Sequence, residues 1–333
     1  MIEVRRYCEA DRDAWNAFLE NSRTPIFLFA RSFMEYHRDR FTDHSLVICD
    51  DGRLVAIFPA SRHGDELISH GGLTFGGFIV GKHEYARNTL RYMAELFAHC
   101  HHNGIPRVVF KQNPSFYSVV TQDETDHAMF LMDAEMYRMD TAFAIDMQCE
   151  PPVPYQERRR RAVNKALKAG VIVTESNDFS AFWETILTPN LLDRFGVAPV
   201  HSLSEIRKLH QDNPGHIRMF EARINGALYA GTVIFETPRV AHAQYISAND
   251  EGRRNGAIDL LFHVLITEVF RQKRYFDFGI ANEQDGHSFN TGLMDWKEGF
   301  GARPFAHRFY RVDTSRHARI LQSLGLVEDA DPN

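Results

Sequence analysis

Two stretches of the chain follow the same plan, and this repetition constrains the fold more than any other feature. Each stretch holds a turn with a strand, then an amphipathic helix, then a second strand. In chain order the segments are 50–61, 81–104 and 105–113 in the first stretch, and 224–236, 250–273 and 274–282 in the second. Strands that alternate with helices indicate sheets covered by helices. The pattern predicts two related α/β halves, although α/β proteins also repeat such units without duplication.

Both predicted helices carry apolar residues at the i, i+3, i+4 spacing of a buried helix face. The positions are Leu90, Met93, Ala94 and Phe97 in the first helix, and Leu261, Val264, Leu265 and Val269 in the second. The predicted fold class is therefore α/β (α+β), with a mixed twisted sheet flanked by helices in each half.

A proline-rich start followed by a basic helix separates the two halves. Residues 151–173 read PPVPYQERRRRAVNKALKAGVIV, and Gly170 is the expected helix end. We therefore expect domains at 1–150 and 151–333. The segment 316–326 predicts a last helix, and 328–333 is expected to be frayed.

The overall charge argues against a broad surface for nucleic acid. The chain of 333 residues has 38 basic and 44 acidic side chains, a formal net charge of −6. A local basic patch remains compatible with this balance. The four cysteines show no CxxC or zinc spacing, which is typical of reduced thiols in a cytoplasmic protein.

The sequence predicts a cytoplasmic protein that does not insert into a membrane. The N-terminal residues MIEVRRYCEADRDAW lack the apolar segment of a signal peptide. The longest apolar runs, such as LLFHVLI, are far shorter than the roughly 20 residues that a membrane helix needs. The oligomeric state cannot be read from these features.

The second predicted helix begins in a turn of unusual composition. Residues 251–257 read EGRRNGA and follow a short predicted strand. A helix N-terminus offers unpaired N–H groups and partial positive charge, and Arg253 and Arg254 would add charge-assisted contacts to a phosphate. The turn therefore predicts an anion site. A solvated turn that merely begins a helix fits the same residues.

This order of strand, basic glycine turn, helix and strand resembles the core of the GNAT acyltransferases. In that superfamily the turn has the pattern Arg/Gln-x-x-Gly-x-Gly/Ala and binds the pyrophosphate of coenzyme A. Arg253 and Gly256 match it, whereas Ile258 replaces the final small residue. The resemblance implies two tandem GNAT-like domains, with the donor site in the second. The coenzyme A-binding residues that it implies are Ile246, Ala248, Gly252, Arg253, Arg254, Asn255, Gly256 and Ala257.

A second motif, YFDFGIANEQDGHSFNTGLMDWKEGFGARP at 275–304, resembles the C-terminal signature of the Fem-type acyltransferases. These are double-GNAT proteins that include peptidoglycan-branching enzymes. The basic segment RRRRAVNKALKAGV and the first-half segment SHGGLTFGGFIV resemble the same group, so the likeness extends from about residue 10 to 310. Relatives of this size imply an enzyme that acylates nucleotide-linked amino sugars for surface polysaccharides of the cell envelope.

Acyl transfer to an amine needs a group that accepts the ammonium proton. Asp277, at the end of a predicted strand, and the loop residues Glu283, Asp285 and His287 are candidates. Tyr245 is a candidate acid for the departing thiolate, although its residue type and position favour a tyrosine of the core. A backbone N–H near Ile246–Ala248 is expected to stabilise the oxyanion.

The acceptor is expected to enter between the two halves. Dense glycines at 71–77 suggest close backbone approach there. The candidate substrate-binding residues are His70, Phe75, Lys111, Asn113, Arg161, Asn282, Asn290 and Lys297. Tight turns, core packing and solvated surface are the competing explanations for these residues.

No metal site is expected, because the densest histidine cluster, HCHHNG at 99–104, lacks nearby carboxylates. The leading hypothesis is an N-acyltransferase that uses acyl-CoA and a nucleotide-linked amino sugar, by direct attack and without nucleic acid. One alternative is an aminoacyl-tRNA-dependent Fem-type transferase acting on a peptidoglycan precursor. Another is an inactive scaffold protein of a polysaccharide pathway.

Overall fold

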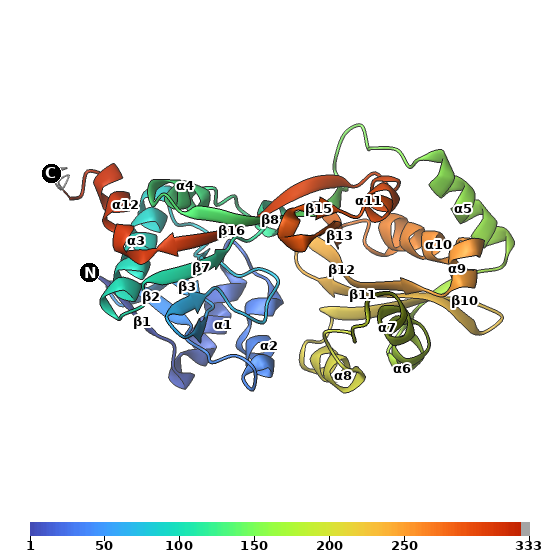
Figure 1. The fold of residues 1–333 in the computed structure, drawn as a ribbon, viewed down its shortest axis with the longest axis horizontal. Coiled ribbons are helices and arrows are strands. Elements are labelled where there is room, and N and C mark those ends of the chain that lie inside the picture. The colour runs from blue at the N-terminus through green and yellow to red at the C-terminus, as the bar shows by residue number, and fades with distance from the viewer. Residues whose placement is uncertain (328–333) are drawn as a thin grey trace. The chain divides into compact units, whose positions relative to one another are not determined.

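The chain forms two compact units, which a computed structural model describes over residues 1–327 (Figure 1). The predicted fraying at 328–333 lies outside the described residues. One unit comprises Met1–Asp140 together with the chain from Ala306 onward, and the other comprises Thr141–Phe305. We call them unit 1 and unit 2.

The return of the chain to unit 1 corrects the expectation that everything after residue 150 belongs to the second domain. The reason is strand β16 (Arg303–Asp313), whose second half pairs antiparallel with β7 (Arg107–Lys111). After it, η8 (Thr314–Arg316) leads into α12 (Ala318–Ser323), which packs on unit 1 through Ile320. The predicted last helix is thus present but shorter than 316–326.

Unit 1 contains a four-stranded antiparallel sheet in the order β1, β2, β3, β6. These strands are Ile2–Arg6, Leu46–Asp50, Arg53–Phe58 and Ile79–Val80. Asp51 and Gly52 both have positive φ, the geometry of a tight hairpin turn. Beside β7 and β16 lie β5 (Glu66–Ile68) and β4 (Ser61–His63).

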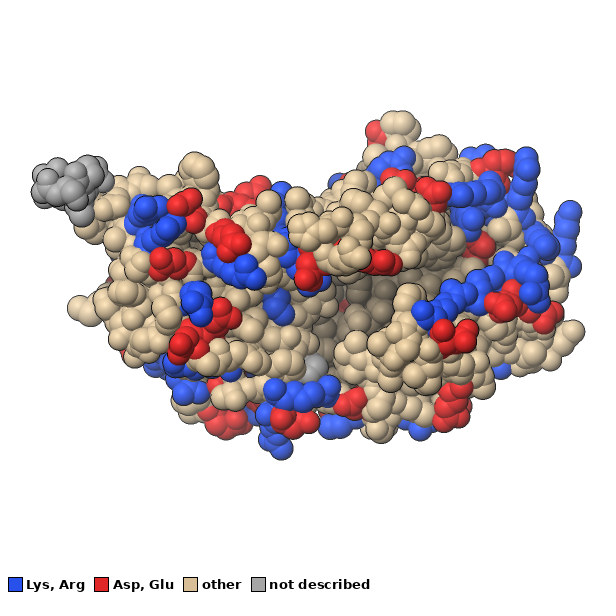
Figure 2. Space-filling model, in the orientation of Figure 1, with Lys and Arg blue, Asp and Glu red and all other residues tan. Residues whose placement is uncertain are grey.

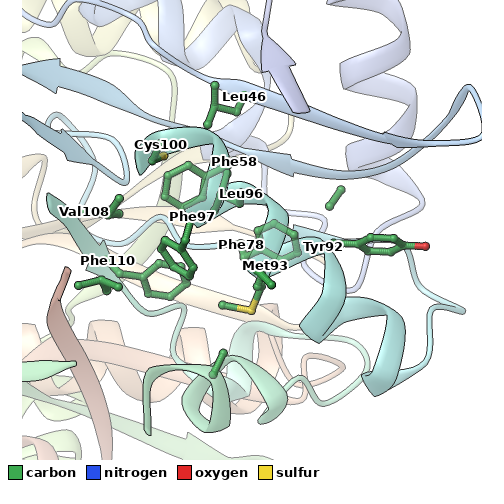
Figure 3. Packing of buried hydrophobic residues seen from close by; sticks show 14 of the residues in the cluster. Leu46, Phe58, Phe78, Tyr92, Met93, Leu96, Phe97, Cys100, Val108 and Phe110 are labelled. Atoms are coloured by element: carbon green, nitrogen blue, oxygen red, sulfur yellow. The ribbon is translucent and has the colours of Figure 1, made fainter. Parts of the chain in front are cut away.

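The helices of unit 1 include the predicted amphipathic one, α3, which is shorter than expected at Ala86–His102. The others are η1 (Glu9–Asp11), α1 (Arg12–Glu20), η2 (Phe27–Phe29), α2 (Arg31–Met34), η3 (Glu35–His37), η4 (Ser115–Tyr117) and α4 (Glu124–Leu131). Figure 3 shows that Met93 and Phe97 of α3 point into a core with Phe58 of β3, Phe110 of β7 and Phe78, which precedes β6. This packing stabilises α3 far more than its helix propensity does.

Unit 2 contains the second half of β8 and five further strands, in the neighbouring order β8, β13, β12, β11, β10, β9. They are Glu135–Asp146, Tyr275–Ile280, Val240–Ala248, Ala227–Glu236, Ile217–Ile224 and Ile172–Ser176, in the same order. Only β12 and β13 pair in parallel among these, and the other pairs are antiparallel. The sheet is therefore mixed, as the sequence predicts.

Helices cover both faces of the sheet in unit 2 (Figure 1). On one face α10 (Ala257–Val264) packs beside α5 (Glu157–Lys168) on an apolar core. On the other face lie α6 (Ser180–Phe182), a π-helical turn η5 (Trp183–Leu187), α7 (Thr188–Phe195) and α8 (Leu203–Asp212). The remaining elements are α9 (Asp250–Asn255), η6 (Leu265–Val269), β14 (Asn282–Glu283), η7 (Gln284–Gly286), β15 (Ser288–Phe289) and α11 (Thr291–Glu298).

The predicted single helix at 250–273 is broken, which corrects both its length and the turn expected at 251–257. Residues 250–255 are themselves helical, and Gly256 then adopts a left-handed conformation with φ 82° before α10 begins. A Cβ at Gly256 would lie 2.3 Å from the carbonyl oxygen of Ala162 on α5. Close packing against α5 therefore requires glycine at this position.

Candidate active site

The candidate site lies where the two parallel strands of unit 2 separate. β12 and β13 pair only from Val240 with Tyr275 to His242 with Asp277. Beyond Asp277 the other pairing of β13, with β8, becomes irregular, and Gly279 has φ 72°. β12 meanwhile continues to Ala248 along β11. The C-terminal half of β12 therefore has an edge without a paired strand.

Backbone N–H groups are directed toward this edge. Asn249 N donates to Tyr229 O, so the residue pair before it, Ala248 and Ala230, is of the non-hydrogen-bonded kind. The N–H groups of Ala248 and, two residues earlier, Ile246 consequently point away from β11. These are the residues that the sequence analysis assigns to the donor thioester.

A cavity of about 640 Å³ adjoins this end of β12. Its wall is mostly apolar, with a few polar side chains at defined places. The lining residues are Arg159, Ala162, Leu187, Asn190, Leu191, Arg194, Phe195, Ile246, Ser247, Ala248, Arg253, Ile258, Asp259, Asn290, Gly292, Leu293 and Trp296. Its size and composition suit a ligand with an apolar body.

The predicted phosphate-binding turn surrounds this cavity only in part. Of its residues, Arg253 lines the cavity, and its guanidinium donates to Ala248 O and to Asp250. Gly252 N donates to Asn249 Oδ1 at 2.7 Å, and Ala257 N donates to Asn255 Oδ1 at 3.0 Å. Arg254 is exposed. Several N–H groups expected to face an anion are thus hydrogen-bonded within the protein.

A buried ion pair occupies the cavity wall at the start of α10. Asp259, in the first helical turn, pairs with Arg159 of α5 and accepts a hydrogen bond from Trp296. Burial nevertheless raises the pKa of Asp259 above its usual value. A carboxylate of the chain itself therefore lies at the positive end of this helix.

Asp277 lies behind a histidine that the sequence analysis did not single out. Asp277 is buried, and its carboxylate contacts His242 Nδ1 at 2.7 Å and accepts from Gly279 N at 2.8 Å. His242 faces Asp277 only because β12 and β13 pair in this register. A polar residue within the apolar run Val240–Ala243 is a signal in the sequence, but its partner is not.

Two residues beyond Asp277 on β13, Gly279 is fixed by a buried lysine. Lys297 donates to the carbonyl oxygens of Gly279 at 2.9 Å and Ile280 at 2.6 Å. Burial lowers the pKa of Lys297 to about 8, and the nearby Asp277 opposes this shift. The ammonium of Lys297 therefore anchors the end of β13.

Tyr245 is buried, with its hydroxyl 2.6 Å from His201 Nδ1 and accepting from His201 N. The His201 carbonyl in turn accepts from the indole of Trp183. The loop before α8 is thereby attached to β12. These contacts account for a tyrosine at this position by packing and hydrogen bonding.

The loop candidates lie apart from Asp277 along the chain and differ in exposure. Asp285 and His287 are exposed, next to the short hairpin of β14 and β15. Asn282 is buried and accepts from Thr141 N at 2.6 Å. Asn290 caps α11 by accepting from Leu293 N, and it also lines the cavity.

The candidates of unit 1 lie around one strand end. Lys111 at the end of β7 donates to the carbonyl oxygens of His70 at 2.8 Å and Leu73 at 2.6 Å. Burial lowers the pKa of Lys111 to about 8. Phe75 packs between Phe29 and Tyr117. These contacts hold the glycine-rich segment 70–77 against β7.

Two further polar groups have different surroundings. The side-chain amide of Asn113 is buried, and neither of its polar atoms has a hydrogen-bond partner within residues 1–327. Arg161 is exposed on α5 of unit 2 and pairs with Glu157 one turn earlier. Arg161 belongs to a run of basic side chains over α5 that Figure 2 shows at the edge of unit 2.

In the part of the chain that the structure describes, no group of three or more His, Cys, Asp or Glu side chains is arranged to hold a metal ion. Across residues 1–327, every helix is too short or too polar to cross a bilayer.

Residues 155–298, which lie within unit 2, match the family model described as "Acetyltransferase (GNAT) domain". No curated protein matches the chain. Unit 2 thus carries an acyltransferase domain of the GNAT type, which confirms the expected enzyme class.

Solved structures share the fold over nearly the whole chain. FemX aligns with a TM-score of 0.67 at 11% identity, covering 96% of this chain and 100% of that one. L-PGS from Bacillus licheniformis aligns with a TM-score of 0.59 at 12% sequence identity, covering 96% of each chain. A tandem GNAT protein from the clavulanic acid biosynthesis pathway aligns with a TM-score of 0.54 at 14% sequence identity, covering 94% of this chain and 99% of that one. These likenesses confirm the predicted tandem GNAT fold, and at such identities they carry nothing further.

Proposed function

We propose that the protein is an N-acyltransferase that moves an acyl group from acyl-CoA to the amine of a nucleotide-linked amino sugar. The observation that carries the proposal is the separation of β12 from β13 beside the 640 Å³ cavity, within the segment that matches a GNAT domain. Acyl-CoA, when bound, supplies the thioester carbonyl. Both substrates are cytoplasmic metabolites, which agrees with the predicted location.

The chain's own groups fit the parts of such a donor. The N–H groups of Ile246 and Ala248 can hold the extended pantetheine and stabilise charge on the carbonyl oxygen. Apolar cavity residues such as Leu191 and Leu293 can take the apolar portion. Arg194 and Arg253, which also line the cavity, can pair with phosphate oxygens.

The choice of a nucleotide-linked acceptor is based on the basic side chains along one face of α5. Arg158, Arg161, Lys165 and Lys168 are exposed along this helix. A diphosphate is a compact dianion that two or three such side chains can bind, without the extended surface that an RNA helix needs. A nucleotide-linked sugar therefore suits the local patch and the overall charge of −6.

An aminoacyl-tRNA donor is the second candidate, and one observation favours it. The first turn of α10 already holds the carboxylate of Asp259, and Ala257 N is occupied by Asn255. A pyrophosphate would compete with these groups. An aminoacyl ester places no phosphate at its reacting end, so it would avoid the competition, while the basic face of α5 would contact the RNA backbone.

A thiol-release assay with acyl-CoAs of increasing chain length and nucleotide-linked amino sugars tests the proposal. We expect thiol release that depends on the amine, continues after RNase treatment, and is accompanied by thermal protection by coenzyme A. Release of no thiol from any acyl-CoA would contradict the proposal. Aminoacyl transfer that RNase stops would establish the second candidate. If neither acyl-CoA nor aminoacyl-tRNA supports any transfer, the inactive scaffold protein is the conclusion.

A further inference from the structure

We propose that His242 is the general base of the acyl transfer and that Asp277 is the residue that positions it. This inference rests on the proposed function and adds a catalytic residue to it. The sequence suggests Asp277 itself as the base. The structure instead buries Asp277 behind His242, whose side chain remains 22% exposed while that of Asp277 is 3% exposed.

The hydrogen bonds define how His242 can act. Its Nδ1 lies 2.7 Å from Asp277 Oδ2. A carboxylate accepts hydrogen bonds, so it favours the tautomer with the proton on Nδ1 and leaves Nε2 with a lone pair. The other carboxylate oxygen accepts from Gly279 N at 2.8 Å. Asp277 therefore holds the ring orientation and stabilises the imidazolium that forms after proton transfer.

The support behind this pair is rigid. Lys297 holds the carbonyls of Gly279 and Ile280, and it is 2% exposed. A Cβ at Gly279 would lie 3.4 Å from Cε1 of His242, so the strand end lies directly against the ring. Asp277 from β13 therefore contacts His242 directly, and Lys297 from α11 lies near Asp277.

The pair also lies at the right place in the sheet. His242 and Asp277 are the last residues that pair in parallel before β12 and β13 separate. Their neighbours Ala241, Ala243, Phe276 and Phe278 pack on the α10 face, so His242 and Asp277 point to the opposite face. The unpaired stretch of β12 begins directly after His242, and Ile246 follows four residues later on the same strand.

In the proposed step the acceptor nitrogen forms a bond to the thioester carbonyl carbon, and the carbon–sulfur bond breaks. Nε2 of His242 takes the proton that the nitrogen loses. The sulfur departs with the bonding electrons and receives the proton of the imidazolium, either directly or relayed by a water molecule. The products are an amide and a free thiol, and His242 returns to its neutral form.

The test combines three variants with the thiol-release assay. His242→Gln is expected to lower kcat by about 10²-fold or more, the usual contribution of a general base. It should retain thermal protection by coenzyme A and lose the low-pH limb of the kcat/KM profile. His242→Ala should be rescued in part by added imidazole. Asp277→Asn should also lower kcat, because an amide can favour the wrong tautomer.

His216→Gln is the matched control, since His216 is half-buried in unit 2 and its Nδ1 contacts the backbone carbonyl of Glu236 at 2.9 Å. We expect it to be as active as the wild type. Full activity of His242→Gln, or an unchanged pH profile with no imidazole rescue, would overturn the assignment of the base while acyl transfer stands. A wild-type protein that releases no thiol would instead overturn the proposed function, and the base with it.

Discussion

The ends of β7 in unit 1 and β13 in unit 2 share one feature, a lysine that donates to backbone carbonyls, and differ in the residues around it. At each end a lysine donates to backbone carbonyls and has its pKa lowered to about 8. These lysines are the half-buried Lys111 on β7 and the buried Lys297 on α11. In unit 2 the fixed strand end carries Asp277 beside His242. In unit 1 the lysine holds a glycine-rich segment. Lys297 thus fixes the end of a strand, whereas Lys111 fixes a loop segment beside its own strand.

The helices at the corresponding places in the two units also differ, in their continuity and in what borders their first turn. In unit 1, α3 is continuous over 17 residues and begins after Tyr85 with no side-chain cap. In unit 2 the corresponding helix is divided by Gly256, and its start borders a cavity. Within residues 1–327, the left-handed break at Gly256 and the adjoining cavity thus distinguish the helix start of unit 2 from that of unit 1.

The largest expected effect concerns the lysine of unit 2. Lys297→Met should lower kcat by about 10²-fold, because release of the Gly279 and Ile280 carbonyls displaces the strand end that supports Asp277. Lys111→Met should lower the free energy of unfolding by about 1–3 kcal/mol through its orphaned carbonyls, with coenzyme A protection retained. Steady-state kinetics and urea unfolding measure both. Equal kcat in Lys297→Met and the wild type would show that this anchor does not support the site.

Substitution of one glycine at a helix end in each unit compares how much that glycine contributes to the free energy of unfolding. Gly256→Ala places a Cβ 2.3 Å from Ala162 O and a left-handed φ on alanine. We expect the free energy of unfolding to fall by about 2–5 kcal/mol, the sum of overpacking and backbone strain. Gly104→Ala, after α3, meets no atom within 4 Å and has only the φ penalty, about 1 kcal/mol. Equal losses in urea unfolding would contradict the packing of Gly256 on α5.

Charge reversal tests which unit binds the donor. Coenzyme A at 100 times its Kd should stabilise the wild type by about 2.7 kcal/mol, and Arg253→Glu should abolish this protection because the residue lines the cavity. Arg87→Glu makes the same change on the exposed first turn of α3 in unit 1. It should leave the thermal shift unchanged. Loss of protection in Arg87→Glu alone would move the donor site to unit 1.

The smallest effect is a pH dependence that both lysines share. A lysine with a folded pKa of about 8 releases its proton before the unfolded chain does, near 10.5. Stability should therefore rise with pH between these values, by at most about 1.4 kcal/mol per pH unit and per lysine. Lys111→Met and Lys297→Met should each show a smaller slope from pH 8 to 9.5. Slopes equal to the wild type would contradict the lowered pKa values.

Sequence reasoning captured the repeated plan, because the spacing of apolar residues and the turn glycines are local signals. It placed strands and helices in both halves, and it identified Arg253 and Asn290, which line the cavity. It placed the chain from Ala306 onward in the wrong unit, since the pairing of β16 with β7 joins segments about 200 residues apart. No local signal specifies such a pairing.

The site was harder to predict for the same reason. The partnership of His242 with Asp277 depends on a parallel register, and a shift by one residue would turn either side chain to the other face. Residues 250–255 fall within both the predicted helix at 250–273 and the predicted turn at 251–257, because their glycine and asparagine are typical of turns although the segment is helical. Gly252 instead lies where a Cβ would meet Tyr229 O at 2.3 Å.

Hydrogen–deuterium exchange with and without coenzyme A tests the central claim most directly, because it reports both units in one experiment. The account predicts protection of residues 246–259 and 290–296, which line the cavity of unit 2. It predicts no change at 79–93, where unit 1 has the corresponding strand end and helix start. Protection at 79–93 without protection at 246–259 would contradict a donor site in unit 2.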